Sequence, residues 1–404
     1  MKNLIAAVLL CGSMALAPAA QGETVRAGTG PEWAGAWGYA TSPATGSVKA
    51  ENPAGTYRYR MRVSQSGDAV RLTVTNPDGA QELKIATITV ARAADRDGFA
   101  LDAQNMRPVT LAAGSGAALS SGQTIVTQPV GLAVKAGDDL IVEIATSAPS
   151  TTVAGNAGFP ASFAPTTGGA AGATLQTIKV RPLVTQIAVR NPSAPCTIVT
   201  LGDSITEGAR GTRPDWRGWP GVLARRLTEK HPKSHCGVVN MGISGNRLLR
   251  DGRGTAAINR FERDVASVPG VSHLILLEGV NDIWRATLPG EPALTADDLI
   301  AGYRKLIAAA HARNIRIIGA TITPGFGWKA FTPAMEDIRQ KTNAWIRSSG
   351  EFDAVIDFEA ALRDTATPPV IKRAFDSGDH LHPGNAGYEA MGRAIPLSLF
   401  QPAR

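Results

Sequence analysis

Ser204, Asp379 and His382 are residues of the types that form a nucleophilic triad. Ser204 lies in the stretch GDSITEG, and the other two lie in the stretch DHLHP. A serine hydroxyl becomes an effective nucleophile when an imidazole takes its proton, and that imidazole needs a carboxylate to fix its tautomer. Asp379 and His382 are three residues apart, so one turn of backbone brings both side chains to the same face. These residues predict the chemistry of ester hydrolysis.

Two further stretches supply candidate donors for the oxyanion that such chemistry creates. Gly245 lies in SGN, and Asn281 lies in GVND. Ser204 offers its own backbone N–H, Gly245 an N–H with no side chain in the way, and Asn281 its side-chain amide. Loss of one such donor typically costs about 3–4 kcal/mol of transition-state stabilisation. We therefore expect an oxyanion hole formed by Ser204, Gly245 and Asn281.

The residues beyond Pro195 have the pattern of alternating strands and helices. Strand candidates recur every 35 to 42 residues, at 197–201, 238–241, 273–277, 315–321 and 354–357. Helical patterns lie between them and after them, at 219–229, 296–313, 338–348 and 385–397. This order predicts βαβ units and a parallel sheet covered on both faces. The strands then end at one edge, where the four stretches named above would meet.

The first half of the chain has the pattern of short antiparallel strands. Apolar side chains alternate with polar ones at 57–63, 70–74 and 140–144, and turn residues separate these runs. The pattern predicts a β-sandwich or jelly roll. The stretch 147–173, rich in small residues, is either a linker or a long loop, and a strand-like run follows at 178–189. We expect domains at 25–192 and 195–404.

The N-terminal residues resemble a secretory signal peptide. Lys2 precedes an apolar run from Leu4 to Leu10, and small residues continue to Ala20. The apolar run is too short to cross a bilayer, and no later segment reaches the roughly 20 apolar residues that a span needs. Cys11 raises the alternative of a lipoprotein, but Leu10 is bulky for that processing. We expect residues 1–20 to be cleaved and the protein to be secreted or periplasmic.

The composition and charge of the chain restrict the classes of partner that we expect. The chain has 44% hydrophobic and 19% charged residues, which is typical of a globular protein. Its formal net charge is +7, but the 41 Lys and Arg residues are scattered rather than clustered. A nucleic-acid partner is therefore not expected. The oligomeric state is left open.

Cys196 and Cys236 remain after removal of the signal peptide and form a candidate disulfide. Cys196 lies eight residues before Ser204, and Cys236 lies nine before Gly245. If Ser204 and Gly245 share one edge of the sheet, both cysteines lie near the opposite end of adjacent strands. In the chain-entropy model a loop of this length stabilises by about 4 kcal/mol.

The four stretches, in this order, resemble those of the SGNH or GDSL-type hydrolase family. The family's serine, glycine, asparagine and Asp-x-x-His-Pro blocks match Ser204, Gly245, Asn281 and the residues from Asp379 to Pro383. The resemblance implies a flavodoxin-like three-layer α/β/α domain with a parallel five-stranded sheet. It also implies hydrolysis of carboxylic esters without a metal or another cofactor. Exported members with an N-terminal β module are similar over the first half.

Several residues keep an alternative interpretation. His380 competes with His382 as the base, although the spacing from Asp379 favours His382. His231 and His235 have the spacing of a metal pair, but Pro232 lies between them. A set of tryptophans either lines an acyl or sugar pocket or belongs to the core, namely Trp216, Trp219 and Trp284.

The substrate class is indicated by the predicted secretion and by the added β module. A secreted enzyme with an added β module suits short acyl groups, such as O-acetyl groups on a polysaccharide or a smaller carbohydrate. A lipase or lysophospholipase with the same residues is the nearest alternative. A non-catalytic carbohydrate-binding protein is another, but the four intact stretches argue against it. An α/β-hydrolase is excluded because the chain has no Gly-x-Ser-x-Gly sequence.

Overall fold

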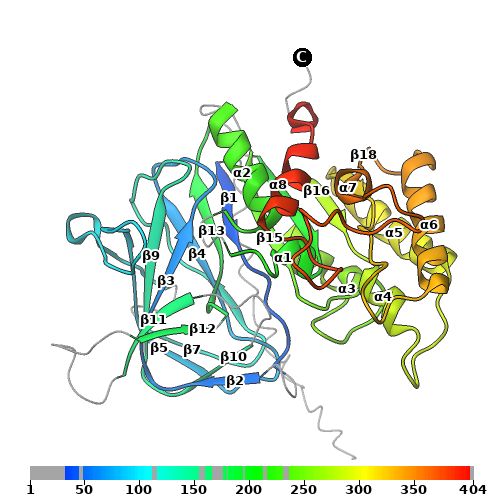
Figure 1. Ribbon diagram of the computed structural model, residues 1–404. Coiled ribbons are helices and arrows are strands. Elements are labelled where there is room, and N and C mark those ends of the chain that lie inside the picture. The colour runs from blue at the N-terminus through cyan, green and yellow to red at the C-terminus, as the bar shows by residue number, and fades with distance from the viewer. Residues whose placement is uncertain are drawn as a thin grey trace, which may run out of the picture.

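A computed structural model describes residues 32–44, 49–111, 116–153, 160–165, 176–179, 181–193, 196–212, 216–230 and 236–400. The predicted signal peptide at 1–20, His231 and His235 lie outside these residues. Figure 1 shows a β-rich region from the first half of the chain beside an α/β region from the second half. No helix among the described residues has the length and apolar character needed to cross a membrane.

The β-rich region consists of antiparallel sheets, as its sequence pattern predicts. One sheet has the order β1-β13-β4-β8, and a larger one has the order β12-β11-β3-β9-β5-β6 with β7 added to β5. A pair, β10-β2, completes the region. The strands are β1 (Trp33–Gly38), β2 (Lys49–Asn52), β3 (Gly55–Arg62), β4 (Val70–Thr75), β5 (Leu83–Arg92), β6 (Arg107–Pro108), β7 (Ala117–Leu119), β8 (Thr124–Val126), β9 (Asp139–Thr146), β10 (Ser150–Val153), β11 (Pro160–Pro165), β12 (Gln176–Lys179) and β13 (Val184–Arg190).

The core of the β-rich region lies between the two larger sheets. Every second side chain of β3 is buried, which is the alternation that a half-buried strand requires. Tyr57, Tyr59 and Met61 of β3 pack in one cluster with Leu72 of β4 and Ile187 of β13. Because these strands belong to different sheets, the sheets pack face to face. The predicted sandwich is confirmed.

The α/β region contains a five-stranded parallel sheet with the order β15-β14-β16-β17-β18. Its strands are β14 (Thr197–Gly202), β15 (Gly237–Gly242), β16 (Val271–Leu277), β17 (Arg316–Ala320) and β18 (Ala354–Ile356). The helices are α1 (Ser204–Glu207), α2 (Gly218–Lys230), α3 (Ala257–Phe261), α4 (Val280–Arg285), α5 (Ala296–His311), α6 (Pro333–Ser348), α7 (Phe358–Leu362) and α8 (Asn385–Ala394), with the short turns η3 (Glu262–Ala266) and η4 (Leu397–Phe400).

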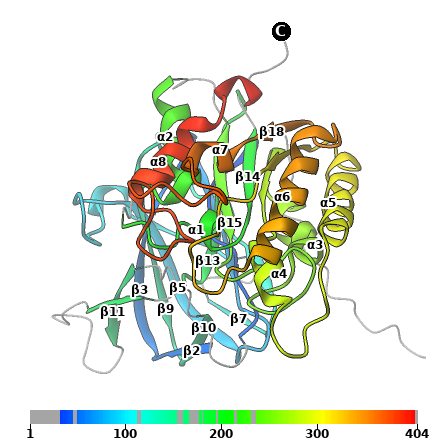
Figure 2. The same cartoon turned by 45° about the vertical axis from the view of Figure 1, so that its right-hand side comes forward.

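Helices cover both faces of the parallel sheet. Ile198 of β14 packs with Leu223 of α2 and Met391 of α8, whereas Val199 packs with Leu306 of α5. Figure 2 shows α2 and α8 on one side of the sheet and α5 and α6 on the other. The predicted three-layer α/β/α fold is confirmed.

The two largest differences between the predicted and observed helix ends have identifiable reasons. The last long helix was expected to reach residue 397 but ends at Ala394, because Ile395 precedes Pro396 and is extended (φ −76°, ψ 117°). A residue before proline is disfavoured in the α conformation. Helix α6 begins at Pro333, five residues earlier than expected. Thr332 caps it by accepting a hydrogen bond from the backbone N–H of Met335, and a proline suits the first helical position.

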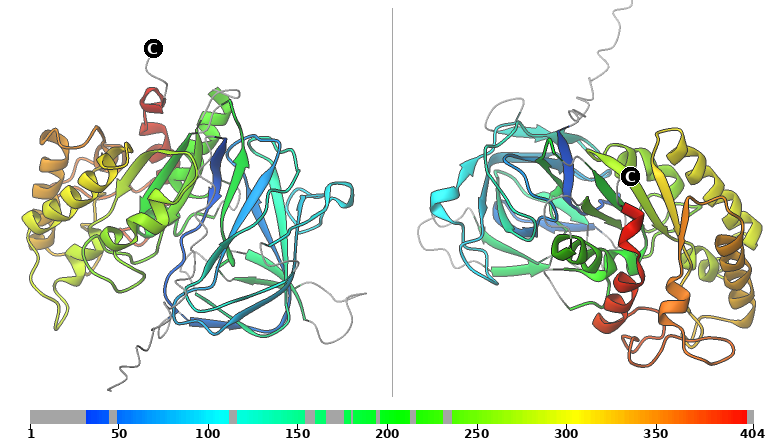
Figure 3. Two further views of the ribbon diagram at one scale, coloured as in Figure 1. Left: turned by 180° about the vertical axis from the view of Figure 1, so that it is seen from behind. Right: turned by 90° about the horizontal axis from the view of Figure 1, so that it is seen from above.

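The two regions meet along β1 and β15, as the views in Figure 3 show. Tyr39, directly after β1, forms a parallel bridge with Asn240 of β15. A Cβ atom added to Gly35 would lie 2.7 Å from the side chain of Val239, and one added to Gly38 would lie 2.3 Å from it. Glycine is therefore needed at both positions, because a side chain at either one would keep β1 from approaching β15 this closely.

A disulfide between Cys196 and Cys236 joins the amino ends of β14 and β15. Gly237 donates its backbone N–H to the Cys196 carbonyl at 2.9 Å, next to the register pair Thr197 and Gly237. The bond thus lies at the opposite end of these strands from Ser204 and Gly245, where the sequence prediction placed it.

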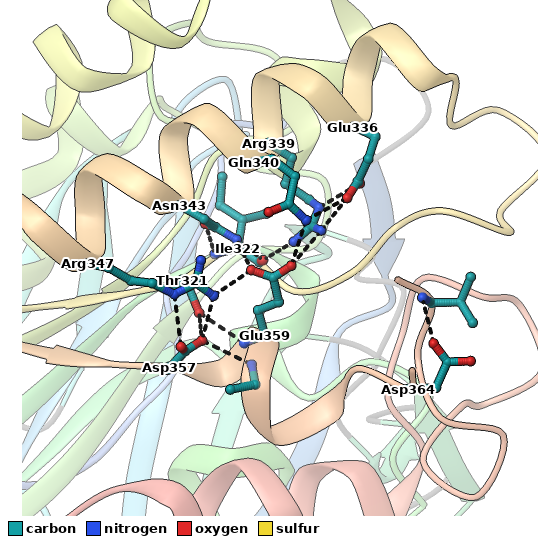
Figure 4. A network of polar contacts seen from close by, with 12 residues as sticks. Thr321, Ile322, Glu336, Arg339, Gln340, Asn343, Arg347, Asp357, Glu359 and Asp364 are labelled. Carbon is teal, nitrogen blue, oxygen red and sulfur yellow. Dashed lines mark hydrogen bonds and ion pairs between the residues drawn. The ribbon is translucent and has the colours of Figure 1, made fainter. Parts of the chain in front are cut away.

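A buried network of charges holds α6 against the end of β17 and the start of α7 (Figure 4). Arg339 contacts Glu336 at 2.5 Å and Glu359 at 2.8 Å, and it donates to the Ile322 carbonyl at 2.8 Å. Arg347 contacts the other oxygen of Glu359 at 2.5 Å. Burial alone would raise the pKa of Glu359, but the two arginines hold it at about 2. The carboxylate therefore stays ionised and keeps α6 attached to this edge of the sheet.

Candidate active site

Ser204 lies at the turn where β14 ends. Asp203 caps α1, because its Oδ1 accepts the Ile205 backbone N–H at 2.8 Å. A Cβ atom on Gly202 would lie 2.4 Å from the Leu277 carbonyl, so only glycine fits before this turn. Gly208, with φ 89°, ends the single helical turn. These local constraints place Ser204 at the carboxyl edge of the sheet with 6% of its surface exposed.

The structure brings the three predicted triad residues together. Ser204 Oγ lies 2.8 Å from His382 Nε2, and His382 Nδ1 lies 2.8 Å from Asp379 Oδ2. The second oxygen of Asp379 accepts the backbone N–H groups of Leu381 at 3.1 Å and His382 at 2.8 Å. The aspartate therefore shapes the loop that carries the histidine and also orients its ring.

Asp379 is suited to hold one tautomer of His382. Partial burial alone would raise its pKa, but the hydrogen bonds from the backbone and ring of His382 lower it to about 2. Arg210 Nε adds a positive charge 3.3 Å from the same carboxylate. An ionised Asp379 accepts the Nδ1–H, which leaves the Nε2 lone pair directed at the Ser204 hydroxyl.

His380, the competing histidine, has a different partner. Its Nδ1 lies 2.6 Å from Asp376, and its side chain is 58% exposed. Its backbone has φ 62°, a left-handed conformation that turns the chain between the aspartate and His382. The structure thus places His382 rather than His380 against Ser204, in agreement with the spacing from Asp379.

Gly245 lies in the loop that follows β15. Its φ of 76° favours glycine, and an added Cβ would lie 2.6 Å from the side chain of Arg253. Ile243 donates to the Gly202 carbonyl at 2.9 Å, and Ser244 donates to a carboxylate oxygen of Glu207 at 2.7 Å. The backbone around Gly245 is therefore tied to both ends of the turn that carries Ser204.

Asn281 comes to the same place from the first turn of α4. Its Nδ2 lies 3.5 Å from Asp203 Oδ2, next to Ser204 in the chain. Its Oδ1 accepts the indole N–H of Trp284 at 2.9 Å. Because this contact occupies the oxygen, it orients the amide so that the NH₂ group points toward the serine turn.

The structure separates the three tryptophans that the sequence left ambiguous. Trp219 is fully buried and packs against Phe358 with ring centroids 5.1 Å apart, so it belongs to the core. Trp216 is half-buried and lies under the guanidinium of Arg62, 5.5 Å from the ring centroid. Trp284 is half-buried beside Asn281 and meets Trp328 edge to face at 5.4 Å. Of the three, Trp284 makes the direct contact with Asn281.

Arg260 is a buried residue beside the site that the sequence pattern does not indicate. It donates to the carbonyls of Gly202 at 3.0 Å and Met241 at 2.6 Å, and to the Asn246 side chain at 3.0 Å. It therefore connects the ends of β14 and β15. A single arginine in an amphipathic stretch gives no signal for such a role, because its partners at the ends of β14 and β15 and at Asn246 are 14 to 58 residues away.

Asp282 is a second buried residue whose hydrogen bonds support the site. Its two carboxylate oxygens accept the backbone N–H groups of Leu248 at 2.7 Å and Leu249 at 3.0 Å. In the stretch GVND the sequence indicates Asn281 as an oxyanion donor and Asp282 as a supporting or turn residue. The structure shows that the neighbouring aspartate fixes the chain that follows Gly245.

Asp203, Glu278 and Asp282 form a buried group of neighbouring carboxyl side chains, and the Arg260 charge acts on Asp203 and Glu278. Burial, and for Asp203 and Glu278 the charges of neighbouring carboxylates as well, raises their pKa above the ordinary value. Burial raises the pKa of Asp282 to about 6. Glu278 Oε1 lies 3.8 Å from Arg260 and has no hydrogen-bond partner among the described residues. A buried ionised carboxylate in this position costs free energy.

Glu278→Gln is expected to stabilise the protein relative to wild type as the pH rises. A raised carboxyl pKa means that the folded state binds the proton more tightly, so its stabilisation is complete below the unfolded pKa of about 4.3 and is lost as pH rises. Glutamine has no such proton to lose. The difference in unfolding free energy between variant and wild type should grow from pH 5 to pH 8, by up to about 1.4 kcal/mol per unit.

Urea titrations at several pH values measure this difference. Glu229→Gln, a change at a side chain that is 62% exposed, is the matched control and should give a constant difference. A pH-independent difference for Glu278→Gln as well would contradict the prediction.

Residues 200–390 match the model of the GDSL-like lipase/acylhydrolase family. This match spans β14 to α8 and contains all four predicted stretches. The α/β region is therefore a GDSL-like lipase/acylhydrolase domain, and the protein is a hydrolase that acts on ester bonds. No curated protein sequence matches the chain.

Solved structures similar to the chain cover about half of it. An acetylxylan esterase from Geobacillus stearothermophilus is 24% identical, with a TM-score of 0.39, over 49% of this chain and 91% of that one. A GDSL-like lipase from Bacteroides thetaiotaomicron is 19% identical, with a TM-score of 0.38, over 49% of this chain and 84% of that one.

Proposed function

We propose that the protein is a secreted serine esterase in which Ser204, His382 and Asp379 form the catalytic triad. The observation that carries this proposal is the continuous chain of contacts from Ser204 Oγ through the His382 ring to Asp379, with both distances 2.8 Å. Nucleophile, base and orienting carboxylate are each within hydrogen-bond distance of the next.

The reaction follows from the placement of these groups. His382 Nε2 takes the Ser204 proton as Oγ attacks the ester carbonyl, and the carbonyl oxygen becomes negative. The backbone N–H groups of Ser204 and Gly245 and the amide of Asn281 stabilise that oxyanion. The protonated His382 then gives its proton to the departing alcohol. A water molecule, activated by the same ring, releases the acid from Ser204.

The proposal includes export and a division into two domains. Residues 1–20 would be removed as a signal peptide, leaving a β-sandwich domain at 25–192 and the hydrolase domain at 195–404. The disulfide between Cys196 and Cys236 supports an oxidising compartment, because such bonds persist mainly outside the cytosol.

The proposed substrates are esters of short acyl groups, such as O-acetyl groups of carbohydrates. Trp284 and Trp328 provide half-buried aromatic surface next to Asn281, which suits a sugar ring. The chain also carries an additional β-rich region beside the hydrolase domain, as expected for an enzyme that meets a polymeric substrate. Long-chain lipid esters would instead require an extended apolar groove.

A series of nitrophenyl esters tests this proposal. We expect the highest kcat/KM for the acetate and a steady fall through butyrate, octanoate and palmitate. A fluorophosphonate should inhibit the enzyme, and peptide mass spectrometry should find the adduct on Ser204. The opposite chain-length order would favour a lipase, and an adduct on another residue would contradict the assigned nucleophile.

A further inference from the structure

Glu207 is a buried carboxylate at the centre of the proposed site. It is the last residue of α1, one helical turn after Ser204, and none of its side-chain surface is exposed. Its backbone N–H is bonded to the Asp203 carbonyl at 2.9 Å. Its Oε2 accepts the Ser244 backbone N–H at 2.7 Å, directly before Gly245. One side chain thus connects the serine turn with the loop that carries Gly245.

The other oxygen of Glu207 is held by residues of the β-rich region. Tyr39 donates its hydroxyl to Oε1 at 2.5 Å, and Arg181 donates from Nη2 to the same oxygen at 3.1 Å. Tyr39 and Arg181 are each only 4% exposed. Neither belongs to the part of the chain that matches the hydrolase family. The β-rich region therefore reaches into the hydrolase domain next to the nucleophile.

The two donors also hold each other in place. The Arg181 guanidinium carbon lies 4.9 Å from the centroid of the Tyr39 ring, and Arg181 Nη1 donates to the Ala40 carbonyl at 2.8 Å. The backbone of Tyr39 is bridged to Asn240, whose Nδ2 donates to the Thr206 carbonyl at 2.9 Å. The turn that contains Ser204 is thus contacted from the β-rich region both directly and through β15.

The charges are arranged so that Glu207 stays an anion. Burial alone would raise the pKa of Glu207, but the Arg181 charge and the hydrogen bonds from Ser244 and Tyr39 lower it. Burial raises the pKa of the Tyr39 phenol, so it remains a neutral donor. The contact is a hydrogen bond from a neutral group to a buried carboxylate, which is a strong type of hydrogen bond.

We propose that Tyr39 and Arg181 are positioning residues of the esterase, which fix Glu207 and through it the relative position of Ser204 and Gly245. This inference rests on the proposed function of those two residues. An oxyanion hole works only when its donors are held at hydrogen-bond distance from the developing charge. The β-rich region is then a part of the catalytic apparatus and not only an attachment to it.

Tyr39→Phe is the direct test. The variant keeps the ring over Arg181 but removes the hydroxyl that holds Glu207. Because the affected groups act on the transition state, kcat should fall about 10-fold or more while KM stays within about twofold. Rates on nitrophenyl acetate are divided by the concentration of active sites, titrated with a fluorophosphonate, so that loss of folded enzyme does not imitate a loss of kcat.

Tyr57→Phe is the matched control. Tyr57 is a buried tyrosine of the same region, and its hydroxyl donates at 2.5 Å to the Pro53 carbonyl, away from the hydrolase domain. It should leave kcat per active site unchanged even if it lowers the melting temperature. Equal losses of kcat in the two variants, or none in Tyr39→Phe, would overturn the proposal.

A double-mutant comparison at Glu207 and a pair of Arg181 variants separate positioning from stability. Glu207→Gln should lower kcat, and adding Tyr39→Phe to it should change kcat by less than about twofold, since both act through the same contact. Additive losses would overturn the proposal. Arg181→Lys, which keeps the charge, should retain more activity per active site than Arg181→Met.

Failure of this inference is distinguishable from failure of the proposed function. If only the inference is wrong, Ser204→Ala is inactive and Tyr39→Phe is fully active. If the proposed function is wrong, Ser204→Ala hydrolyses esters as wild type does, and the inference falls with it.

Discussion

Ser204→Ala is expected to lower kcat for ester hydrolysis by about 10⁴- to 10⁶-fold, as is typical when a triad nucleophile is removed. The variant loses one hydroxyl, and the carboxylate and imidazole behind it keep their 2.8 Å contact. The fold should therefore persist, with a melting temperature within a few degrees of wild type. Kinetics on nitrophenyl acetate together with a thermal melt measure both effects.

Ser272→Ala is a closely matched control. Ser272 Oγ lies 2.8 Å from His273 Nδ1, the same separation as between Ser204 and His382. This pair lies at the amino end of β16, away from the site. Burial and the nearby charge of Arg316 lower the pKa of His273 to about 4, which makes it a poor base. Normal activity is expected, and activity in Ser204→Ala equal to wild type would refute the assigned mechanism.

Asn281→Ala is expected to lower kcat by about 10²- to 10³-fold with a small change in KM. The amide NH₂ points toward the serine turn because Trp284 holds its oxygen at 2.9 Å. Its donated hydrogen bond strengthens as the carbonyl oxygen becomes charged, so its loss acts on the transition state rather than on substrate binding. Steady-state kinetics on a soluble acetate ester separate the two parameters.

Asn343→Ala provides the comparison for that change. Asn343 is also a fully buried amide of the hydrolase domain, but its contacts are to Ile322 and Glu359 in the network of Figure 4. Its loss should reduce the free energy of unfolding and leave kcat per active site unchanged. A fall in kcat as large as that of Asn281→Ala would contradict the oxyanion role of Asn281, because loss of a buried amide away from the site would then lower kcat equally.

The residues that the sequence identified are all positioned by interactions within short stretches of the chain. The tight turn around Ser204 requires glycine at 202 and 208, and only two loop residues separate Asp379 from His382. The periodic strands then bring these stretches to one edge of the sheet. Pattern and local geometry were therefore sufficient to predict the fold class and the contacts of the proposed triad.

The residues that the sequence did not reveal depend on contacts between distant segments. The sequence shows Glu207 only as one residue of the GDSITEG stretch. Its role is not visible there, because its partner Tyr39 is 168 residues away. The sequence left Trp284 undecided between core and pocket, because an aromatic residue in a helix next to a sheet suits both. Only the packed structure shows which atoms of Asn281 and Glu207 are already occupied.

The close approach of β1 to β15 also limits access of other polypeptide chains to the outer strand of the parallel sheet. Strand β15 is the last of its sheet, and an unpaired outer strand offers N–H and carbonyl groups to which another molecule can add by β-pairing. Here Ser64 accepts the Val238 N–H at 2.8 Å and donates to the Val238 carbonyl at 3.1 Å, and the bridge to Tyr39 follows at Asn240. The β-rich region therefore occupies hydrogen-bonding groups of this outer strand that would otherwise be open to β-pairing with another molecule.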